Sequence, residues 1–569
     1  MTTADDICDP SLSVHVVWEP LAEGCTRGPW DQAIIEHLLA GRYRAPRWPV
    51  FTHHDSLADV PDGEGAIVVL PARHHASLDD LRRLNGMIAR LPWLLLILNG
   101  DEEHCYPFGN VHHPNMRLWV QTPDPDRTYP PGTRGLVNGP APLAYETTWR
   151  PKTLDVSFAG QVTHSRREQC AAAVKALHDA GRTGELVQSA GFTQGIEQGD
   201  YMGLMAATKV CPAPSGPVCV DSFRLWEACE LGGVPLLDGL LPSGADQAVY
   251  WARVMGEPRG TGALGHLLGD WSDLAATVAF NLSVWPRGAA RSAAWWQRYQ
   301  RDLARNLVSD LESLGAPLPE AGVDDLITVL VPTSPIPSHP STAILRETVE
   351  SVRAQLPHAE ILVLCDGPNP SVEGYRAAYE SYLYEVARLC REEWHDVLPV
   401  IHDTHQHQSG MTRHALNLVT THTILYAEHD CPIRGSIPWR QMLDAITDDA
   451  ARVIRLHHEA RIHPEHEHLM LGPSKDIRGV QMAPTQQWSQ RPHLASTALY
   501  RQAITCHFGG KACMIEDVLH GVVQTDTTQG CWDRWKLHIL TEPNGEHGIR
   551  RSWHTDGRAG DLKWTGEVR

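Results

Sequence analysis

The sequence predicts an α/β protein with parallel sheets, and three observations lead to that prediction. Short apolar runs with the length of buried strands alternate with segments of helical periodicity along most of the 569 residues. Acidic residues directly follow several of these runs, as at the carboxyl ends of parallel strands. No internal repeat interrupts the alternation. Because strands that alternate with helices pair side by side in parallel, we expect parallel sheets throughout.

Residues 1–150 form the first of three βα-rich segments, since a chain of this length is too long for one core. Helical patterns cover residues 30–39 and 77–89. The Pro-rich passage QTPDPDRTYPPGTRG precedes the next segment and is typical of a surface connection. The buried strands of this segment are predicted in SVHVVWEPL, GAIVVLPA and WLLLILNG.

Residues 151–322 form the second segment. It opens with the strand TLDVSFAG and a helix over about residues 166–180, and it continues with strand signals in ATKVCPAP and GVPLLDG. The passage LGAPLPEAGVDD, at 314–325, carries Pro, Gly and acids and is predicted to be the main linker. Residues 323–569 form the third segment, with strands in LITVLVPTSP and EILVLCDGP and a helix over 342–355.

Composition excludes some classes of protein. The net charge of −19 argues against a broad nucleic-acid-binding surface. The longest apolar run, LPWLLLILNG, is too short to cross a bilayer, so no membrane span is expected. The thirteen cysteines contain no Cys-x-x-Cys pair and the first residues lack a signal-peptide pattern, which together favour a cytoplasmic protein with reduced thiols.

The stretch LYAEHDCPI carries the most informative chemistry. Its apolar run ends at Glu428-His429-Asp430, and two acids spaced i, i+2 on an extended chain point to the same side. At the carboxyl end of an α/β sheet that side faces the ligand crevice. A hard divalent ion that also binds phosphate oxygens would relieve the repulsion between the two carboxylates. Glu428 and Asp430 are therefore predicted to bind metal.

Three further acids complete an ordered series. Asp366 ends the strand in AEILVLCDGP, and Glu516 and Asp517 begin an apolar helical pattern in GGKACMIEDVLHGVV. This order resembles the family 2 glycosyltransferases, which have the GT-A fold, over about residues 326–525. The resemblance implies that Asp366 contacts the nucleotide and that Glu428 and Asp430 bind Mn or Mg on the donor diphosphate. It also implies that Asp517 is the catalytic base, with Glu516 second.

The chemistry requires these roles, because a sugar hydroxyl is a poor nucleophile until a carboxylate removes its proton, and a cation neutralises the leaving diphosphate. Two departures from the family pattern are a Glu in place of the first Asp and His429 in the middle. The stretch SGMTRHALNLV resembles the family's donor-site segment, which implies that Arg413 and Asn417 lie near the donor.

Histidines offer additional metal ligands. His520 and His554 are candidates in the C-terminal segment. The tract HHEARIHPEHEHLML is rich in histidine, but it lacks the His-x-x-x-His frame with an activating Glu, so a polar loop is favoured over a zinc site.

The second segment contains a different pattern. In DSFRLWEACELGGVP, Arg224 and Glu227 share one face of a predicted helix that Asp221 or Ser222 can cap. The helix ends at a Gly-Gly pair, and a helix N-terminus beside the Ser215-Gly216 loop can hold a diphosphate without metal.

The pattern resembles the exostosin-like glycosyltransferases, which have the GT-B fold, over about residues 151–245. The resemblance implies a nucleotide-sugar site, with Glu227 on the ribose hydroxyls. The residues that carry this implied site are Arg166, Ser215, Gly216, Ser222, Arg224 and Glu227.

Together these resemblances imply a GT-B part with an acceptor-side half (1–150) and a nucleotide-sugar half (151–322), followed by a GT-A domain (323–569). We expect a bifunctional glycosyltransferase that moves sugars from nucleotide-sugar donors to acceptor hydroxyls on a glycan, a protein or a modified nucleic acid. One alternative keeps a single active domain beside a degenerate acceptor-binding module. Another alternative is glycosylation of hydroxylated bases in DNA. It is favoured by two basic-aromatic segments, RRSWHTDGR and RTYPPGTR.

Overall fold

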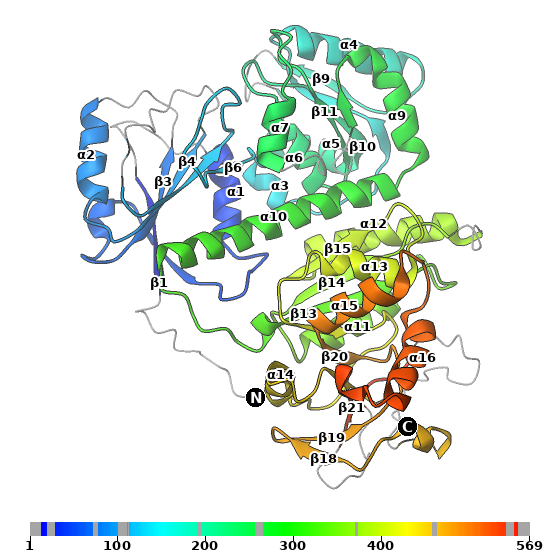
Figure 1. The fold of residues 1–569 in the computed structure, drawn as a ribbon. Coiled ribbons are helices and arrows are strands. Elements are labelled where there is room, and N and C mark those ends of the chain that lie inside the picture. Colours follow the sequence, from blue (N-terminus) through cyan, green and yellow to red (C-terminus); the bar gives the residue numbers. More distant parts are fainter. Residues whose placement is uncertain are drawn as a thin grey trace. The chain divides into compact units, whose positions relative to one another are not determined.

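The computed structural model describes residues 13–19, 29–71, 78–100, 111, 113–189, 191, 195–255, 266–369, 374–457, 462, 464–541 and 551–555. The chain divides into two compact units, Met1–Glu320 and Ala321–Arg569. The division falls within the Pro- and Gly-containing passage 314–325. Figure 1 shows both units as mixed α/β structures with parallel strands. None of the helices in the described part of the chain combines the length and the apolar character that a bilayer span requires.

The first sheet of unit 1 is six-stranded among the described residues, entirely parallel, with the order β2-β1-β3-β4-β5-β6. The three apolar strands and the helices α1 and α2 were predicted within three residues of their observed bounds. The more polar strands β2, β5 and β6 were not predicted. The elements are β1 (Ser13–Trp18), α1 (Pro29–Leu39), β2 (Val50–His54), β3 (Ala66–Pro71), α2 (Leu78–Ile88), β4 (Leu94–Asn99), β5 (Met116–Gln121), β6 (Arg134–Leu136) and α3 (Pro142–Glu146).

The second sheet of unit 1 is also parallel, with the order β12-β11-β10-β7, and β8 pairs with β9 beside it. The predicted strand TLDVSFAG is interrupted at Ser157, which separates β7 from β8. The elements are β7 (Leu154–Val156), β8 (Phe158–Gln161), α4 (Ser165–Asp179), β9 (Leu186–Ser189), α5 (Gln198–Ala207), β10 (Thr208–Ala213), α6 (Phe223–Glu230), β11 (Val234–Asp238), α7 (Ala248–Met255), β12 (His266–Leu268) and α9 (Leu274–Ser283).

Helix α10 (Arg287–Leu314) joins the two sheets of unit 1. It contacts β4 and β5 of the first sheet and β11 and α6 of the second, and it runs along both in Figure 1. One continuous apolar core includes Trp119 of β5, Trp226 of α6 and Trp296 of α10. Burial of several tryptophans in one core stabilises the pairing of the sheets, because large aromatic side chains remove the most apolar surface from water.

Buried carboxylates pair with indole N–H groups in this core. Asp310 of α10 accepts from Trp119 Nε1 at 2.8 Å and from Arg134 Nε at 2.6 Å. Asp221 accepts from Trp226 Nε1 and from the hydroxyl of Tyr250, both at 2.5 Å. These charged hydrogen bonds satisfy acids that would otherwise be costly to bury.

Unit 2 contains a nine-stranded sheet among its described residues, with the order β15-β14-β13-β16-β20-β17-β21-β19-β18. Its first four strands are parallel, but β20 is antiparallel to β16 and β17, and β19 is antiparallel to β18 and β21. The prediction of parallel sheets throughout was therefore wrong for this half of the sheet. The strands are β13 (Ile327–Thr333), β14 (Glu360–Cys365), β15 (Val397–Ile401), β16 (Thr423–Tyr426), β17 (Val453–Arg455), β18 (Lys475–Ile477), β19 (Val480–Pro484), β20 (His493–Ser496) and β21 (Leu537–Leu540).

The helices of unit 2 agree with the predictions that were made for them. Residues 343–353 are helical as expected from 342–355, and the acid pair Glu516-Asp517 does lie in the first turn of a helix. The helices are α11 (Ala343–Arg353), α12 (Arg376–Glu392), α13 (His407–Leu416), α14 (Trp439–Thr447), α15 (Thr497–Phe508) and α16 (Ile515–Thr528).

Candidate active site

Asp366 lies directly after β14 and holds the turn that leads into α13. Its Oδ1 accepts from the main-chain N–H groups of Gly367 at 2.8 Å and Gln406 at 2.7 Å, and its Oδ2 accepts from His407 N at 3.2 Å. His405 Nδ1 lies 2.8 Å from Oδ2. The carboxylate is almost completely buried. Its contacts within the protein thus fix the start of α13 at the carboxyl end of β14.

The first turn of α13 connects two further parts of the site. Gln408 Nε2 donates to Glu428 Oε1, and Gln408 Oε1 accepts from Ile515 N at 3.2 Å. Ser409 Oγ accepts from Cys513 N at 3.1 Å, which holds the segment before α16 against the same turn. One short stretch of α13 therefore contacts Asp366, the acidic motif and the N-terminus of α16. The sequence offered no sign of this role for Gln408.

The acid pair of α16 lies on this connected structure. Glu516 Oε2 accepts from Gln490 N at 2.9 Å. Burial and a neighbouring histidine lower the pKa of His407, whereas the charges of Asp366 and Asp517 act to raise it. Asp517 and Asp366 thus both act electrostatically on the first residue of α13. The proximity of these acids follows from the fold, because they are far apart in the sequence.

Glu428 and Asp430 continue the edge of β16. Ala427 N donates to Leu330 O at 3.0 Å and His429 N donates to Pro332 O at 3.2 Å, so the backbone stays paired with β13 beyond the end of β16. The main-chain groups of Ala427 and His429 make these hydrogen bonds, and the side chains of Glu428 and Asp430 lie close together. This is the arrangement that the i, i+2 spacing predicted.

Four side chains could hold a metal ion here: Glu428, Asp430, Cys431 and His554, each with one ligand atom within 4.8 Å of the others. His554 Nδ1 lies 3.4 Å from Asp430 Oδ2 and 3.2 Å from Cys431 Sγ, and Cys431 Sγ lies 3.6 Å from Asp430 Oδ1. A hydrogen bond to Asp430 raises the pKa of His554, and the charges of Asp430 and Glu428 add to this effect. The same negative field favours a divalent cation.

A C-terminal segment brings His554 to this group. Thr555 N donates to Asp430 O at 3.0 Å, and Ser552 forms an antiparallel bridge with Ile433. Ser552 is completely buried. The sequence named His554 as a candidate ligand, but it gave no reason to place it beside Asp430. Cys431 was not named, although it directly follows Asp430.

The other predicted residues of unit 2 lie elsewhere. Arg413 belongs to the last turn of α13 and Asn417 is its C-cap, so they are roughly 8–14 Å along the helix from Gln408. His520 Nδ1 lies 3.2 Å from Trp488 O, outside the group of four. The described histidines of the tract, His457, His466 and His468, are also outside this group, and His458 and His463 lie outside the described residues.

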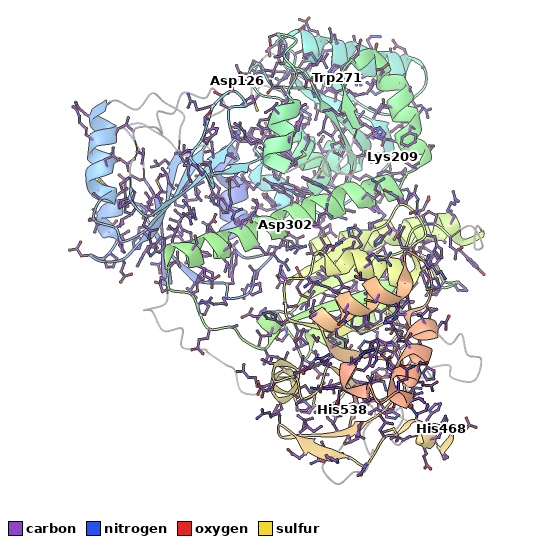
Figure 2. The ribbon with its side chains drawn as sticks, viewed as in Figure 1. Asp126, Lys209, Trp271, Asp302, His468 and His538 are labelled. Atoms are coloured by element: carbon purple, nitrogen blue, oxygen red, sulfur yellow. The ribbon has the colours of Figure 1, made fainter. Side chains whose placement is uncertain are left out.

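The predicted nucleotide-sugar residues of unit 1 surround the carboxyl ends of β8, β10 and β11. Arg166 is paired with Asp238, with Arg166 Nε 3.1 Å from both carboxylate oxygens, and both side chains are buried. Trp271 Nε1, labelled in Figure 2, donates to Asp238 Oδ2 at 3.2 Å. The Arg166 guanidinium is therefore held by a carboxylate of the protein, and it fixes the start of α4 against β11.

Glu227 is also engaged inside the protein. It accepts from the hydroxyl of Tyr201 at 2.5 Å and is 2 % exposed. Burial raises the pKa of Glu227, against the lowering effects of this hydrogen bond and of Arg224. Ser222 is the N-cap residue of α6 but makes no side-chain capping bond, and Asp221 binds the indole and hydroxyl described above. The predicted capping role is therefore not fulfilled by either side chain.

Two of the predicted residues carry a buried polar atom that meets no hydrogen-bond partner among the described residues: Ser215 Oγ and Arg224 Nη1. Arg224 Nε donates to Ala159 O at 2.9 Å, and its guanidinium lies 5.0 Å from the centre of the Phe158 ring. A Cβ at Gly160 would clash with Arg224 Nη2, so a larger residue there would displace the guanidinium. Buried donors without a partner indicate room for a polar ligand, because such groups are costly unless they are satisfied.

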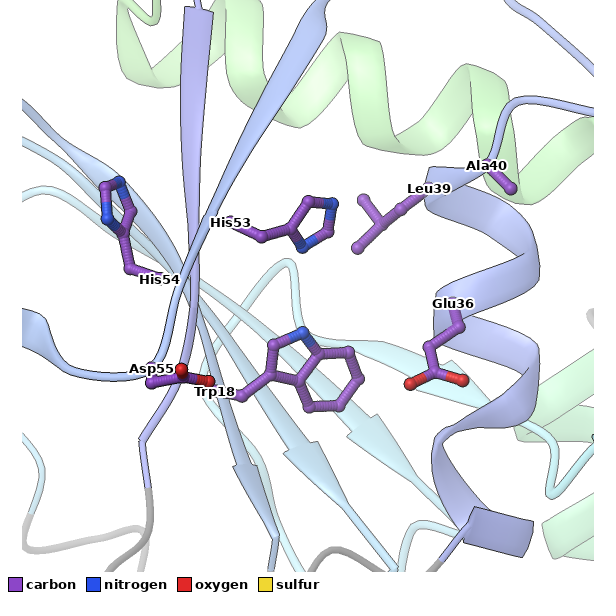
Figure 3. A pocket seen from close by; sticks show the side chains of 7 residues that line it. All are labelled: Trp18, Glu36, Leu39, Ala40, His53, His54 and Asp55. Carbon is purple, nitrogen blue, oxygen red and sulfur yellow. The ribbon is translucent and has the colours of Figure 1, made fainter.

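A cavity of about 510 Å³ opens at the carboxyl ends of β1 and β2. Figure 3 shows Trp18 and His53 facing Leu39 and Glu36 of α1 across it, whereas the ring of His54 points away. Asp55 and Ala40 complete the lining. The cavity thus combines an indole, an imidazole and two carboxylates.

Comparisons with known proteins add little beyond this. No protein-family model matches the chain, and no curated protein sequence matches it. The crystal structure of S. aureus TarS matches with a TM-score of 0.25 and 13% identity, covering 40% of this chain and 36% of that one. The structure of residues 1–349 of the same protein in complex with UDP-GlcNAc matches with a TM-score of 0.24 and 12% identity, covering 40% of this chain and 58% of that one. The mannosyltransferase PcManGT from Pyrobaculum calidifontis, in complex with GDP-Man and Mn²⁺, matches with a TM-score of 0.25 and 12% identity, covering 39% of this chain and 55% of that one. The chain therefore spans well under two thirds of these proteins, and such weak likeness says nothing about function.

Proposed function

We propose that unit 2 is a metal-dependent glycosyltransferase of the GT-A, family 2-like kind, which moves a sugar from a nucleotide-diphosphate donor to an acceptor hydroxyl. The observation that carries the proposal is the convergence of acids on the first turn of α13. Asp366 accepts from that turn, Gln408 in the turn binds Glu428, and Gln408 also holds the N-terminus of α16 with Glu516 and Asp517.

Each acid has a proposed task. Asp517 takes the proton of the acceptor hydroxyl as it attacks, and Glu516 positions the first turn of α16 through its bond from Gln490. Asp430 and His554 would hold a divalent ion, with Glu428 beside it, and the ion when bound neutralises the charge of the leaving diphosphate. Asp366 shapes the nucleotide side of the site by fixing the turn at 405–407.

We further propose that unit 1 is a second, exostosin-like glycosyltransferase of the GT-B kind, with an acceptor-side half at 1–150 and a nucleotide-sugar half at 151–322. Ser215 Oγ and Arg224 Nη1 would bind the donor diphosphate, and Gly216 allows close approach of the loop. The cavity beside Trp18 suits an uncharged or cationic sugar acceptor, because it offers an aromatic face and two carboxylates for hydroxyl groups. Arg166 and Glu227 would act indirectly, by positioning α4 and α6.

The test is a screen of nucleotide sugars by thermal shift, with and without Mn²⁺, followed by transfer assays on two variants. Binding to the native state raises the melting temperature, so a donor is recognised before any acceptor is known. We expect Asp517→Asn to lower kcat of the metal-dependent reaction by about 10²–10⁴-fold without abolishing donor binding. Arg224→Gln should impair a metal-independent reaction instead. If no nucleotide sugar shifts the wild-type melting temperature, both proposals fail.

The same experiment decides whether one unit is only a binding module. In that case one of the two substitutions would leave every transfer reaction unchanged. Asp533→Asn is a matched control for Asp517→Asn, because Asp533 is exposed and lies in a separate 3-10 turn of unit 2.

A further inference from the structure

We propose that Cys431 is a thiolate ligand of the metal centre in unit 2, and that this centre selects a borderline ion such as Zn²⁺ over Mg²⁺. Asp430, Cys431 and His554 would be its three protein ligands. The inference deepens the function proposed above, but ion binding is measured without any transfer reaction. The two can therefore fail separately.

The three side chains lie close enough together to bind one ion. Cys431 Sγ to Asp430 Oδ1 is 3.6 Å, His554 Nδ1 to Asp430 Oδ2 is 3.4 Å, and Cys431 Sγ to His554 Nδ1 is 3.2 Å. Metal–ligand bonds of about 2.0–2.3 Å in a tetrahedron place neighbouring ligand atoms about 3.3–3.6 Å apart. Bonds of about 2.1 Å in the octahedral oxygen shell of Mg²⁺ place them about 3.0 Å apart. The two distances to Asp430, each to a different carboxylate oxygen, fall in the tetrahedral range, and the distance between Cys431 and His554 lies between the two cases.

The types of ligand point the same way. Mg²⁺ takes oxygen ligands, whereas a set of thiolate, imidazole and carboxylate suits Zn²⁺ and its spectroscopic substitute Co²⁺. The turn that carries Asp430 and Cys431 is closed by the hydrogen bond from Cys431 N to Glu428 O at 2.9 Å. Cys431 is completely buried, and its thiol lies on the side of Asp430 and His554.

Glu428 has a separate place in this arrangement. Its Oε1 accepts from Gln408 Nε2, which ties it to α13. Three protein ligands with one further position are the pattern of catalytic zinc sites, whereas four protein ligands make a closed structural site. We therefore assign the fourth position to water or to a phosphate oxygen of the donor, with Glu428 beside it.

The test is a titration of the reduced, metal-free, full-length protein with Co²⁺, followed by absorption spectroscopy. We expect one equivalent to produce a sulfur-to-cobalt charge-transfer band in the near ultraviolet and the strong visible bands of a tetrahedral ion. Zn²⁺ should abolish both bands, and excess Mg²⁺ should leave them unchanged. Cys431→Ser should remove the charge-transfer band and weaken Co²⁺ binding by more than about 100-fold, since loss of an outer-shell partner already costs about 10–100-fold. Cys506→Ser, an exposed cysteine, is the matched control and should keep the band.

His554→Ala gives a second test that does not depend on the folding of the buried cysteine variant, because the His554 side chain is 41% exposed. It should weaken Co²⁺ binding similarly and leave the circular dichroism spectrum unchanged. A cobalt spectrum without a charge-transfer band, or one that Cys431→Ser leaves intact, would overturn the inference. Transfer activity without the charge-transfer band would support the proposed function but show that Cys431 is not a metal ligand. A charge-transfer band without transfer activity would support the Cys431 ligand but contradict the proposed function.

Discussion

Gln408 and Glu428 are joined side chain to side chain, and the same amide group accepts the main-chain N–H of Ile515. A single buried glutamine thus orients the Glu428 carboxylate and the N-terminus of a helix 107 residues further along the chain. Both ends of the amide are used, so its orientation is fixed by the network and not only by packing. The position of Glu428 relative to the acids of α16 therefore depends on Gln408.

Replacing Gln408 by Leu should destabilise unit 2 by about 1–3 kcal/mol, because the change leaves the Ile515 N–H and a Glu428 oxygen without their partner. Urea unfolding monitored by circular dichroism measures this effect. Gln441→Leu makes the same change at an exposed position of α14 and should alter stability little. Equal unfolding midpoints for the two variants would show that the amide bridge has no energetic importance.

The stability of unit 2 should rise with pH between about 4 and 6.5 through His493. Burial lowers the pKa of His493 from 6.5 to about 4, so the unfolded chain binds the additional proton in this interval. The stabilisation is complete above pH 6.5 and is lost as the pH falls, and the interval corresponds to about 3 kcal/mol. In urea titrations at several pH values, His493→Gln should have a shallower pH dependence than the wild type. His468→Gln, the same change on an exposed side chain (Figure 2), should retain the wild-type slope.

Asp310→Ala should lower the stability of unit 1 by about 3 kcal/mol. The change leaves Trp119 Nε1 and Arg134 without their carboxylate in a region where both are partly or fully buried. Asp302→Ala provides the control on the same helix, since the Asp302 side chain, labelled in Figure 2, is 52% exposed and pairs with Arg301 instead of Trp119 or Arg134. Thermal melts of the two variants should separate by several degrees.

Arg224→Gln should weaken nucleotide-sugar binding to unit 1 by about 10–100-fold, because a hydrogen bond to a charged group contributes about 1.5–3 kcal/mol. Isothermal titration calorimetry with the donor found by the thermal-shift screen measures the change. Arg182→Gln removes an exposed arginine and should bind as the wild type does. Unchanged affinity in Arg224→Gln would remove Arg224 from the donor site.

The sequence predicted the apolar strands well, because β1, β3, β4 and β13 are nearly continuous buried apolar runs. It did not predict β2 and β5, since VFTHH and MRLWVQ carry polar side chains that obscure strand patterns. The Pro-rich passage 121–135 contains the end of β5 and the start of β6, so it returns the chain to the same sheet. Antiparallel pairing of β20 could not be read locally, because strand direction depends on partners that are distant in sequence.

The same distinction applies to the candidate site. Residues that end strands, such as Asp366 and Asp430, were recognisable because their position follows from local pattern. Gln408 and Cys431 were not, since their roles come from contacts with Glu428 and His554 that only the folded chain creates. Arg166 and Glu227 were identified by family resemblance, but in the structure they bind Asp238 and Tyr201.

Helix α10 has a practical consequence for dissecting the protein. Its apolar face belongs equally to the sheet that begins at Ser13 and the sheet that ends at Leu268, so a cut near residue 150 would expose a tryptophan-rich surface on both fragments. Such fragments should aggregate when expressed separately. A boundary at Glu320, by contrast, leaves the helix whole, so truncation there is the way to obtain each unit for study in isolation.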